Sequence, residues 1–134
     1  MADAVTSTTI ADGDRSAVIQ LTSTSDGTGE SAVTKIDVSA LAVRSSDGAA
    51  CTGCKVSRIN YSTLGMSVKL LWDATTNTIC WDLREHSDDV DFSYMGGLQN
   101  TAAASGKTGD IALTTTGHSA GDSYVIVITV IKEF

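Results

Sequence analysis

Ser119 lies within residues 117–121, whose sequence GHSAG fits the G-x-S-x-G pattern of serine hydrolases with an α/β fold. In that pattern a strand precedes the nucleophile, and a helix follows whose N-terminus faces the developing oxyanion. Here residues 111–116 and 124–131, on either side, are rich in β-branched types and predict strands. No histidine follows Ser119 to complete a triad in the order of that fold. We therefore predict a glycine-rich loop that joins the last two strands of a hairpin, and a protein that is not an enzyme.

Cys51 and Cys54 form a C-x-x-C pair, a spacing found in zinc sites and in thiol redox centres. A structural zinc needs four ligands, and the remaining candidates are Cys80, His86 and His118, with no second C-x-x-C pair. A redox centre would need a helix N-terminus to lower the thiol pKa, and the sequence predicts none here. We expect no metal and no cofactor. The cysteines are either inert thiols or disulfide candidates: a bridge within the C-x-x-C loop, a bond to Cys80, or a bond to a neighbouring subunit.

The charge balance is acidic, with sixteen Asp and Glu residues against nine Lys and Arg and a formal net charge of −7. Nucleic-acid backbones require a basic patch, so we predict no nucleic-acid partner. No apolar run approaches the ~20 residues that cross a bilayer, so we predict no membrane partner. The densest acidic segment, residues 85–91, predicts a solvated loop, because the spacing and the glycine of an EF-hand are missing.

Clusters of Gly, Ser, Asp and Asn recur along the chain and separate short β-rich segments. Several segments alternate apolar and polar residues with the period of two that is typical of strands with one buried face. We predict one all-β domain over residues 1–134, an antiparallel β-sandwich or jelly roll of about eight or nine strands with little helix. Residues 42–53 and 96–109 break the regular spacing and are predicted to be crossover or contact loops.

The segment from Tyr124 to Ile131 is apolar at seven of its eight positions, so both of its faces are apolar. Such a strand is either central in the sandwich or covered on its outer face by another subunit. The candidate subunit contacts in this strand are Tyr124, Ile126 and Ile128. Aromatic residues elsewhere fall on the inward phase of their segments, and we predict them to be core rather than a sugar-binding platform. They are Trp72, Trp81, Phe92 and Tyr94.

Turn and strand signatures extend over nearly the full chain, among them SDGTGE at 25–30, LWDAT at 71–75 and GGLQN at 96–100. The others lie at residues 2–6, 12–15, 61–63, 65–68 and 106–124. Together they resemble a group of small β-rich virion proteins of tailed bacteriophages, the capsid decoration or cement proteins. The segment from Ala42 to Cys54 is where the chain is least similar to that group.

The resemblance implies a protein that is made in the bacterial cytoplasm and lies on the outer capsid surface of the virion. Its partners would be the major capsid protein and copies of itself, most simply as a homotrimer, and it would clamp neighbouring capsid subunits after the head expands. Terminal arms are the usual means by which such proteins reach a neighbour, so residues 1–9 are expected to form an extended arm, in which residues 2–8 are ordered only when bound. The candidate contacts in this arm are Ala2, Asp3, Ala4, Val5, Thr6, Ser7 and Thr8.

Two alternatives remain open at this stage. One is another structural component of the virion, at the head–tail junction or in the tail. The other, from a different class, is a carbohydrate-binding β-sandwich module.

Overall fold

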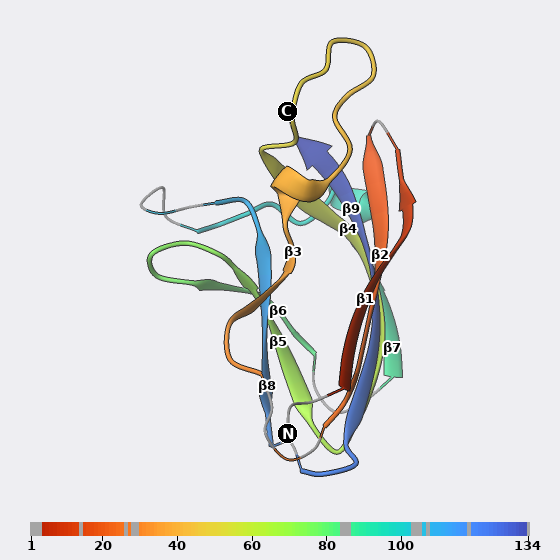
Figure 1. Cartoon of the computed structure of the whole chain (residues 1–134), viewed down its shortest axis with the longest axis vertical. Helices are drawn as coiled ribbons and strands as arrows, with labels where there is room; N and C mark the ends of the chain where they lie inside the picture. Colours follow the sequence, from red (N-terminus) through yellow and green to blue (C-terminus); the bar gives the residue numbers. More distant parts are fainter. Residues whose placement is uncertain are drawn as a thin grey trace.

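The structure is a computed structural model that describes residues 4–13, 15–25, 27, 30–83, 87–102, 106, 108–117 and 119–133. Its nine described strands form two antiparallel sheets that face each other, which confirms the predicted all-β sandwich (Figure 1). The strands are β1 (Ala4–Asp12), β2 (Ser16–Thr24), β3 (Val33–Ile36), β4 (Gly53–Leu64), β5 (Ser67–Trp72), β6 (Thr78–Leu83), β7 (Ser87–Asp91), β8 (Ile111–Thr116) and β9 (Ser123–Glu133).

One sheet has five strands in the order β1-β2-β9-β4-β7, and the other has four in the order β3-β8-β5-β6. Two short 3₁₀ turns, η1 (Val38–Ala40) and η2 (Ser93–Met95), are the helical elements in the part of the chain that the structure describes. No described helix is long and apolar enough to cross a lipid bilayer.

The core lies between the sheets because the strands alternate buried and outward-facing residues. In β2, Ala17, Ile19 and Leu21 are buried, while the residues between them face outward. In β4 the alternation is interrupted by a β-bulge between Val56 and Arg58. The extra residue shifts the phase by one, so that Val56 and Ile59 both point into the core.

Strand β9 is the centre of the five-stranded sheet and pairs along its length with β2 on one side and β4 on the other. The strand therefore has the central position that was the first of the two predicted alternatives, and its inward face is buried, whereas Val125 on its outward face is 43% exposed.

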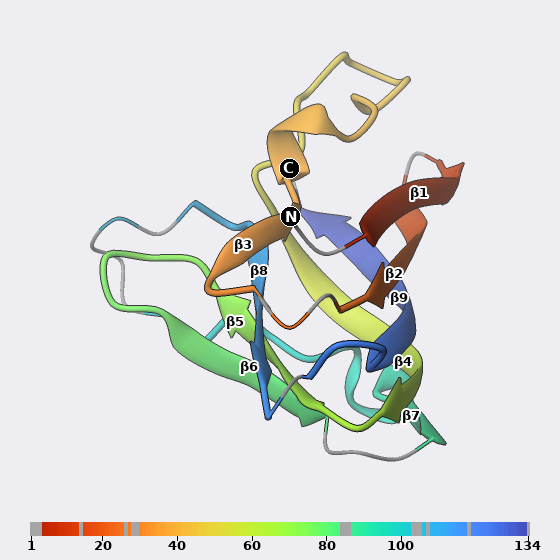
Figure 2. The same ribbon diagram turned by 60° about the horizontal axis from the view of Figure 1, so that its bottom comes forward.

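The loop after β8 does not join a hairpin, which corrects the prediction for residues 117–121. Strand β8 pairs with β3 and β5 in the four-stranded sheet, whereas β9 belongs to the other sheet. The chain therefore crosses from one sheet to the other at this point (Figure 2). Sequence spacing could not distinguish the two connections, since both need a short glycine-rich turn.

Residues 87–91 form strand β7, an edge strand paired with β4, where the sequence predicted a solvated loop. The two predicted long loops agree better with the structure. Residues 41–52 contain turns but no strand and project from the end of the sandwich at which β9 terminates (Figure 1). The described residues between η2 and β8 contain a single isolated bridge, from Leu98 to Val56.

Gly65 connects β4 to β5, and its substitution by alanine is expected to destabilise the fold. Its φ is +77°, and an added Cβ would collide with the carboxylate of Asp122. We expect Gly65→Ala to lower the free energy of unfolding by on the order of 2–3 kcal/mol in chemical denaturation. Gly48 is the matched control, because its φ is +73° and an added Cβ would meet nothing within 4 Å. Gly48→Ala should cost about 1 kcal/mol, and equal losses in the two variants would contradict the collision with Asp122.

Candidate interaction surface

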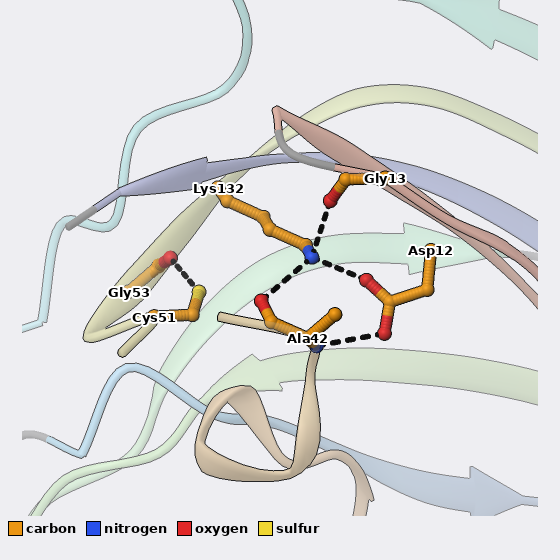
Figure 3. A network of polar contacts seen from close by, with 6 residues as sticks. All are labelled: Asp12, Gly13, Ala42, Cys51, Gly53 and Lys132. Carbon is orange, nitrogen blue, oxygen red and sulfur yellow. Dashed lines mark hydrogen bonds and ion pairs between the residues drawn. The ribbon is translucent and has the colours of Figure 1, made fainter. Parts of the chain in front are cut away.

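The side chain of Lys132 is completely buried and binds three acceptors near the end of the five-stranded sheet (Figure 3). Its ammonium group donates to the carbonyl oxygens of Gly13, at 2.6 Å, and Ala42, at 3.0 Å, and forms an ion pair with Asp12. Asp12 also accepts a hydrogen bond of 2.8 Å from the backbone N–H of Ala42. Lys132 therefore joins β9 to the β1–β2 hairpin and to the segment that follows η1.

The pKa of Asp12 reflects this network. Burial alone would raise the pKa, but the hydrogen bonds from Lys132 and Ala42 and the positive charge of Lys132 together outweigh burial. The net result is a pKa below the ordinary value for an aspartate. The acid is held ionised by a fixed cation and is saturated with donors, so its role is to hold the strands together.

A second buried polar network, around Glu30, links the two sheets. Glu30 precedes β3 and pairs with Lys35, and each side chain is only 7% exposed. The hydroxyl of Tyr124, from β9, donates to the Glu30 carboxylate at 2.6 Å. The backbone of Glu30 is fixed as well, because its N–H donates to the Thr115 hydroxyl and its carbonyl accepts from the Thr115 N–H. Sequence reasoning assigned no role to Glu30 or Lys35.

The three cysteines are free thiols and all are buried, with exposed fractions of 4% for Cys51, 0% for Cys54 and 6% for Cys80. The structure forms no bond among them, and burial disfavours a bond to a neighbouring subunit, so disulfide formation stays a prediction beside the alternative of inert thiols. Burial raises the pKa of Cys54 to about 12 and also raises the pKa of Cys80. Among the described residues, no group of three or more His, Cys, Asp or Glu side chains could hold a metal ion.

Burial of all three thiols, together with the raised pKa values of Cys54 and Cys80, predicts slow thiol chemistry, because a reagent must reach the sulfur and the thiolate is the reactive form. In the folded protein we expect Cys51, Cys54 and Cys80 to react with Ellman's reagent only at the rate of unfolding, and all three to react at once in denaturant. A Val5→Cys variant, at a position 43% exposed, provides the fast-reacting control. Rapid labelling of the native wild-type protein would contradict the buried positions.

Ser119 is exposed in the crossover between β8 and β9. Its backbone N–H donates to the carboxylate of Asp122 at 2.7 Å, and its carbonyl accepts from the Asp122 N–H, so both groups close a local turn. A strand, β9, follows in place of the helix that a nucleophile elbow needs. We expect Ser119→Ala to leave stability unchanged and a fluorophosphonate probe to leave Ser119 unlabelled; labelling at this residue would refute the prediction.

The predicted contact residues fall into two groups. Residues 1–3 lie outside the described part of the chain, but residues 4–9 are paired with β2 as part of the edge strand β1. The expectation of an arm ordered only when bound is therefore wrong for residues 4–8. The side chains of Val5, Thr6, Ser7 and Thr8 are nevertheless exposed and remain available for contact.

Tyr124, Ile126 and Ile128 are buried in the chain's own core, with exposed fractions of 1%, 0% and 0%. They cannot contact another subunit, which corrects their prediction as contacts. The opposite face of β9 points outward and carries Val125, Val127, Thr129 and Ile131. The sequence contained a signal for this choice of face, because Ser123, Thr129 and Glu133 share the phase of Val125. Lys132, which is buried, lies on the inward phase, and a charged residue there concealed the signal.

We use the term outer face for the solvent side of the five-stranded sheet around β9, which none of the opposite strands covers. Val125 is 43% exposed there, and Leu64 of β4 is 63% exposed. Their neighbours in register are uncharged, namely Thr22 on β2 and Ser62 on β4. Charged residues of β4 border the face directly: Arg58, in register with Thr129, pairs with Asp89 and lines a shallow groove, and Lys55 is in register with Ile131. The members of the outer face are Leu64, Val125, Val127, Thr129 and Ile131.

The aromatic residues differ in their positions. Trp72 and Phe92 are buried, and Trp81 packs edge-on against Phe92 with ring centroids 4.8 Å apart, as predicted for core residues. Tyr94 is 83% exposed, so its predicted core position is wrong. It lies in η2, where the backbone turns and the alternation counted from Phe92 no longer applies.

The fold and surface define an antiparallel β-sandwich with two buried ion pairs, an exposed apolar stretch on the outer face of β9 and an exposed edge strand, β1. Comparison of the chain with protein-family models, curated proteins and solved structures finds no match.

Proposed function

We propose that this chain is a capsid decoration protein of a tailed bacteriophage, which binds the outer surface of the expanded head and clamps neighbouring subunits of the major capsid protein. The observation that carries the proposal is the outer face, whose five members are uncharged and mostly apolar, on a chain whose net charge is −7. The resemblance of the sequence to decoration proteins supports the same function, and an acidic protein suits the outside of a shell that holds DNA inside.

The outer face suits docking because it belongs to the most rigidly paired part of the molecule. Strand β9 is held between β2 and β4, so Val125 and Val127 are presented on a backbone that has little freedom to lose on binding. Burial of apolar area contributes roughly 25 cal/mol per Å², so one such face gives modest affinity. Many copies on one shell, acting together, raise the effective affinity.

Self-association is part of the proposal. The resemblance implies a homotrimer on the capsid surface, and a reconstruction of the complete particle tests the number of copies at each attachment site.

The proposal is tested by attachment to particles. Val125→Asp places a charge in the outer face and should abolish binding to expanded heads that lack the protein. Ile79→Asp is the matched control, because Ile79 is 53% exposed on β6 of the opposite sheet. That variant should bind as the wild type does. Particles without the protein should burst at lower temperature than complete particles, and adding the wild-type chain should restore their stability.

Two results would overturn the proposal. Equal binding of the Val125→Asp and wild-type chains would exclude the outer face as the docking surface. Particles that lack the protein, keep their stability and lose their tails or their infectivity would favour the head–tail or tail alternative.

Carbohydrate binding is a second candidate, and one observation favours it. Tyr94 is 83% exposed beside Met95, 46% exposed, and an exposed aromatic ring is a common platform for a sugar. A glycan array tests this function: binding that is lost in Tyr94→Ala and retained in Val125→Asp would support it, and an array without signal would exclude it for the sugars displayed.

A further inference from the structure

The free edge of β1 differs from the three other sheet edges. Strand β1 has nine residues, and its residues 4–11 carry no charge. The opposite edge of the same sheet, β7, contains Asp88, Asp89 and Asp91. In the other sheet, β3 has only four residues and includes Lys35, and β6 includes Asp82. Short length and charge are the usual protections of an edge strand against pairing, and β1 has neither.

The backbone of β1 is suitable for pairing with a further strand. From Ala4 to Thr9 it runs in regular register with β2, and the bulge comes only after Thr9. Outward-directed N–H and C=O groups along these residues therefore form an open ladder. The side chains of residues 5–12 are exposed, including Val5 at 43% and Ile10 at 56%. Figure 2 shows β1 at the margin of the sandwich, with β2 on its inner side.

We propose that β1 pairs with β1 of a second copy of this chain, antiparallel across a two-fold axis that passes through Thr6 or Ser7. The two five-stranded sheets would then form one continuous sheet of ten strands, with the two β7 edges at its ends. Each β7 carries three aspartates, so this arrangement places the acidic edges as far apart as the sheet allows.

Charge and side-chain chemistry favour a second copy as the occupant. Two chains of net charge −7 repel each other, and β1 is the long edge at which both surfaces are free of charge. An axis through Ser7 places Thr6 opposite Thr8 of the other copy and Val5 opposite its Thr9. Cross-strand threonine pairs stabilise antiparallel strands, and the hydroxyls of Thr6 and Thr22 already form such a contact between β1 and β2.

The exposure of the inward-facing side of β1 also favours a second copy of the chain as its partner. A groove lies between β1 and the segment from β3 to η1, and its lining includes Ser7, Thr9, Ile36 and Leu41. The opposite sheet therefore does not close over β1, which leaves Val5 exposed. A second β1 would cover Val5 from the side.

This inference does not depend on the proposed function, because it concerns the chain alone in solution. It differs from the homotrimer that the resemblance implies, since a two-fold contact joins copies in pairs.

Sedimentation equilibrium of the purified chain at increasing concentration tests the proposal. We expect the mass to rise from one chain to two. Thr8→Lys should remain at the mass of one chain throughout, because a lysine in an edge strand blocks pairing. Ser87→Lys is the matched control, since it adds the same charge to the other edge strand of the same sheet, and it should dimerise as the wild type does. Circular dichroism verifies that both variants are folded.

Cysteine cross-linking identifies the strand that pairs. Either Thr6→Cys or Ser7→Cys should form a disulfide-linked dimer on mild oxidation, because the residue on the axis lies opposite itself. The three native thiols are buried, so the wild type provides the uncross-linked background. A wild-type chain that stays monomeric, a dimer that survives Thr8→Lys, or the absence of cross-linking at both positions would overturn the proposal. If the chain proved not to dimerise through β1, the particle-binding experiment with Val125→Asp would still test the proposed function. The two hypotheses are therefore tested separately.

Discussion

Lys132→Met is expected to lower the free energy of unfolding by on the order of 3 kcal/mol. The substitution keeps the length of the side chain but removes the ammonium group that binds Asp12, Gly13 and Ala42. Two carbonyl oxygens then lose their donor, and the Asp12 carboxylate, 22% exposed, loses its counter-ion. Chemical denaturation followed by circular dichroism measures the loss.

The control for this variant is Arg58→Met. Arg58 forms an ion pair with Asp89 in which the two side chains are 55% and 38% exposed. An exposed pair contributes at most about 1 kcal/mol, because water solvates both charges when they separate. Similar losses of unfolding free energy in Lys132→Met and Arg58→Met would show that burial of the Lys132 network adds nothing to stability.

The same network predicts a change in acid sensitivity. The pKa of Asp12 is lower in the folded protein than its ordinary value of 3.8, so its stabilising contribution is complete above that value. The contribution is lost as the pH falls through the folded pKa. In Lys132→Met the pKa of Asp12 should return toward its ordinary value. When the pH is lowered from about 4 to about 2, the variant should therefore lose less stability than the wild type. Parallel pH profiles of the two proteins would contradict this.

The second large effect is expected at Lys35. Lys35→Met leaves the Glu30 carboxylate, only 7% exposed, without its cation and should cost on the order of 3 to 5 kcal/mol. The loss should exceed that of a surface ion pair because the uncompensated charge stays away from water. Equilibrium denaturation measures it.

A double-mutant cycle tests whether the uncompensated charge of Glu30 causes the loss of stability in Lys35→Met. Glu30→Gln combined with Lys35→Met removes both charges and leaves an amide that can still accept from Tyr124. The double variant should therefore be more stable than Lys35→Met alone. If the two losses simply add, the residues do not form a coupled buried pair.

The pattern of alternation was sufficient to predict the sandwich, because strands with one buried face alternate visibly. The segment around Ala17, Ile19 and Leu21 is an example, and all three residues are buried. Strand β7 was not predicted, since an exposed edge strand contains no apolar phase. The charged residues of β7 instead gave the pattern of a loop.

The buried polar network could not be predicted for a different reason. Asp12 and Lys132 are 120 residues apart in the chain, and Glu30 and Tyr124 are 94 apart. No local pattern connects such partners, and a charged residue in a strand is ordinarily assigned to solvent. In β9 the difficulty was different: Ser123, Thr129 and Glu133 marked the outward face, but the buried Lys132 on the opposite phase concealed this signal.

The position of β9 also determines when the molecule can fold during its synthesis. Strands β2 and β4 are made early but do not pair with each other, because β9 lies between them. Until residues 123–133 leave the ribosome, the hydrophobic sides of the five-stranded sheet have no centre around which to assemble. The facing edges of β2 and β4 therefore stay unpaired in the nascent chain until β9 emerges, and during this interval they are open to pairing with other chains.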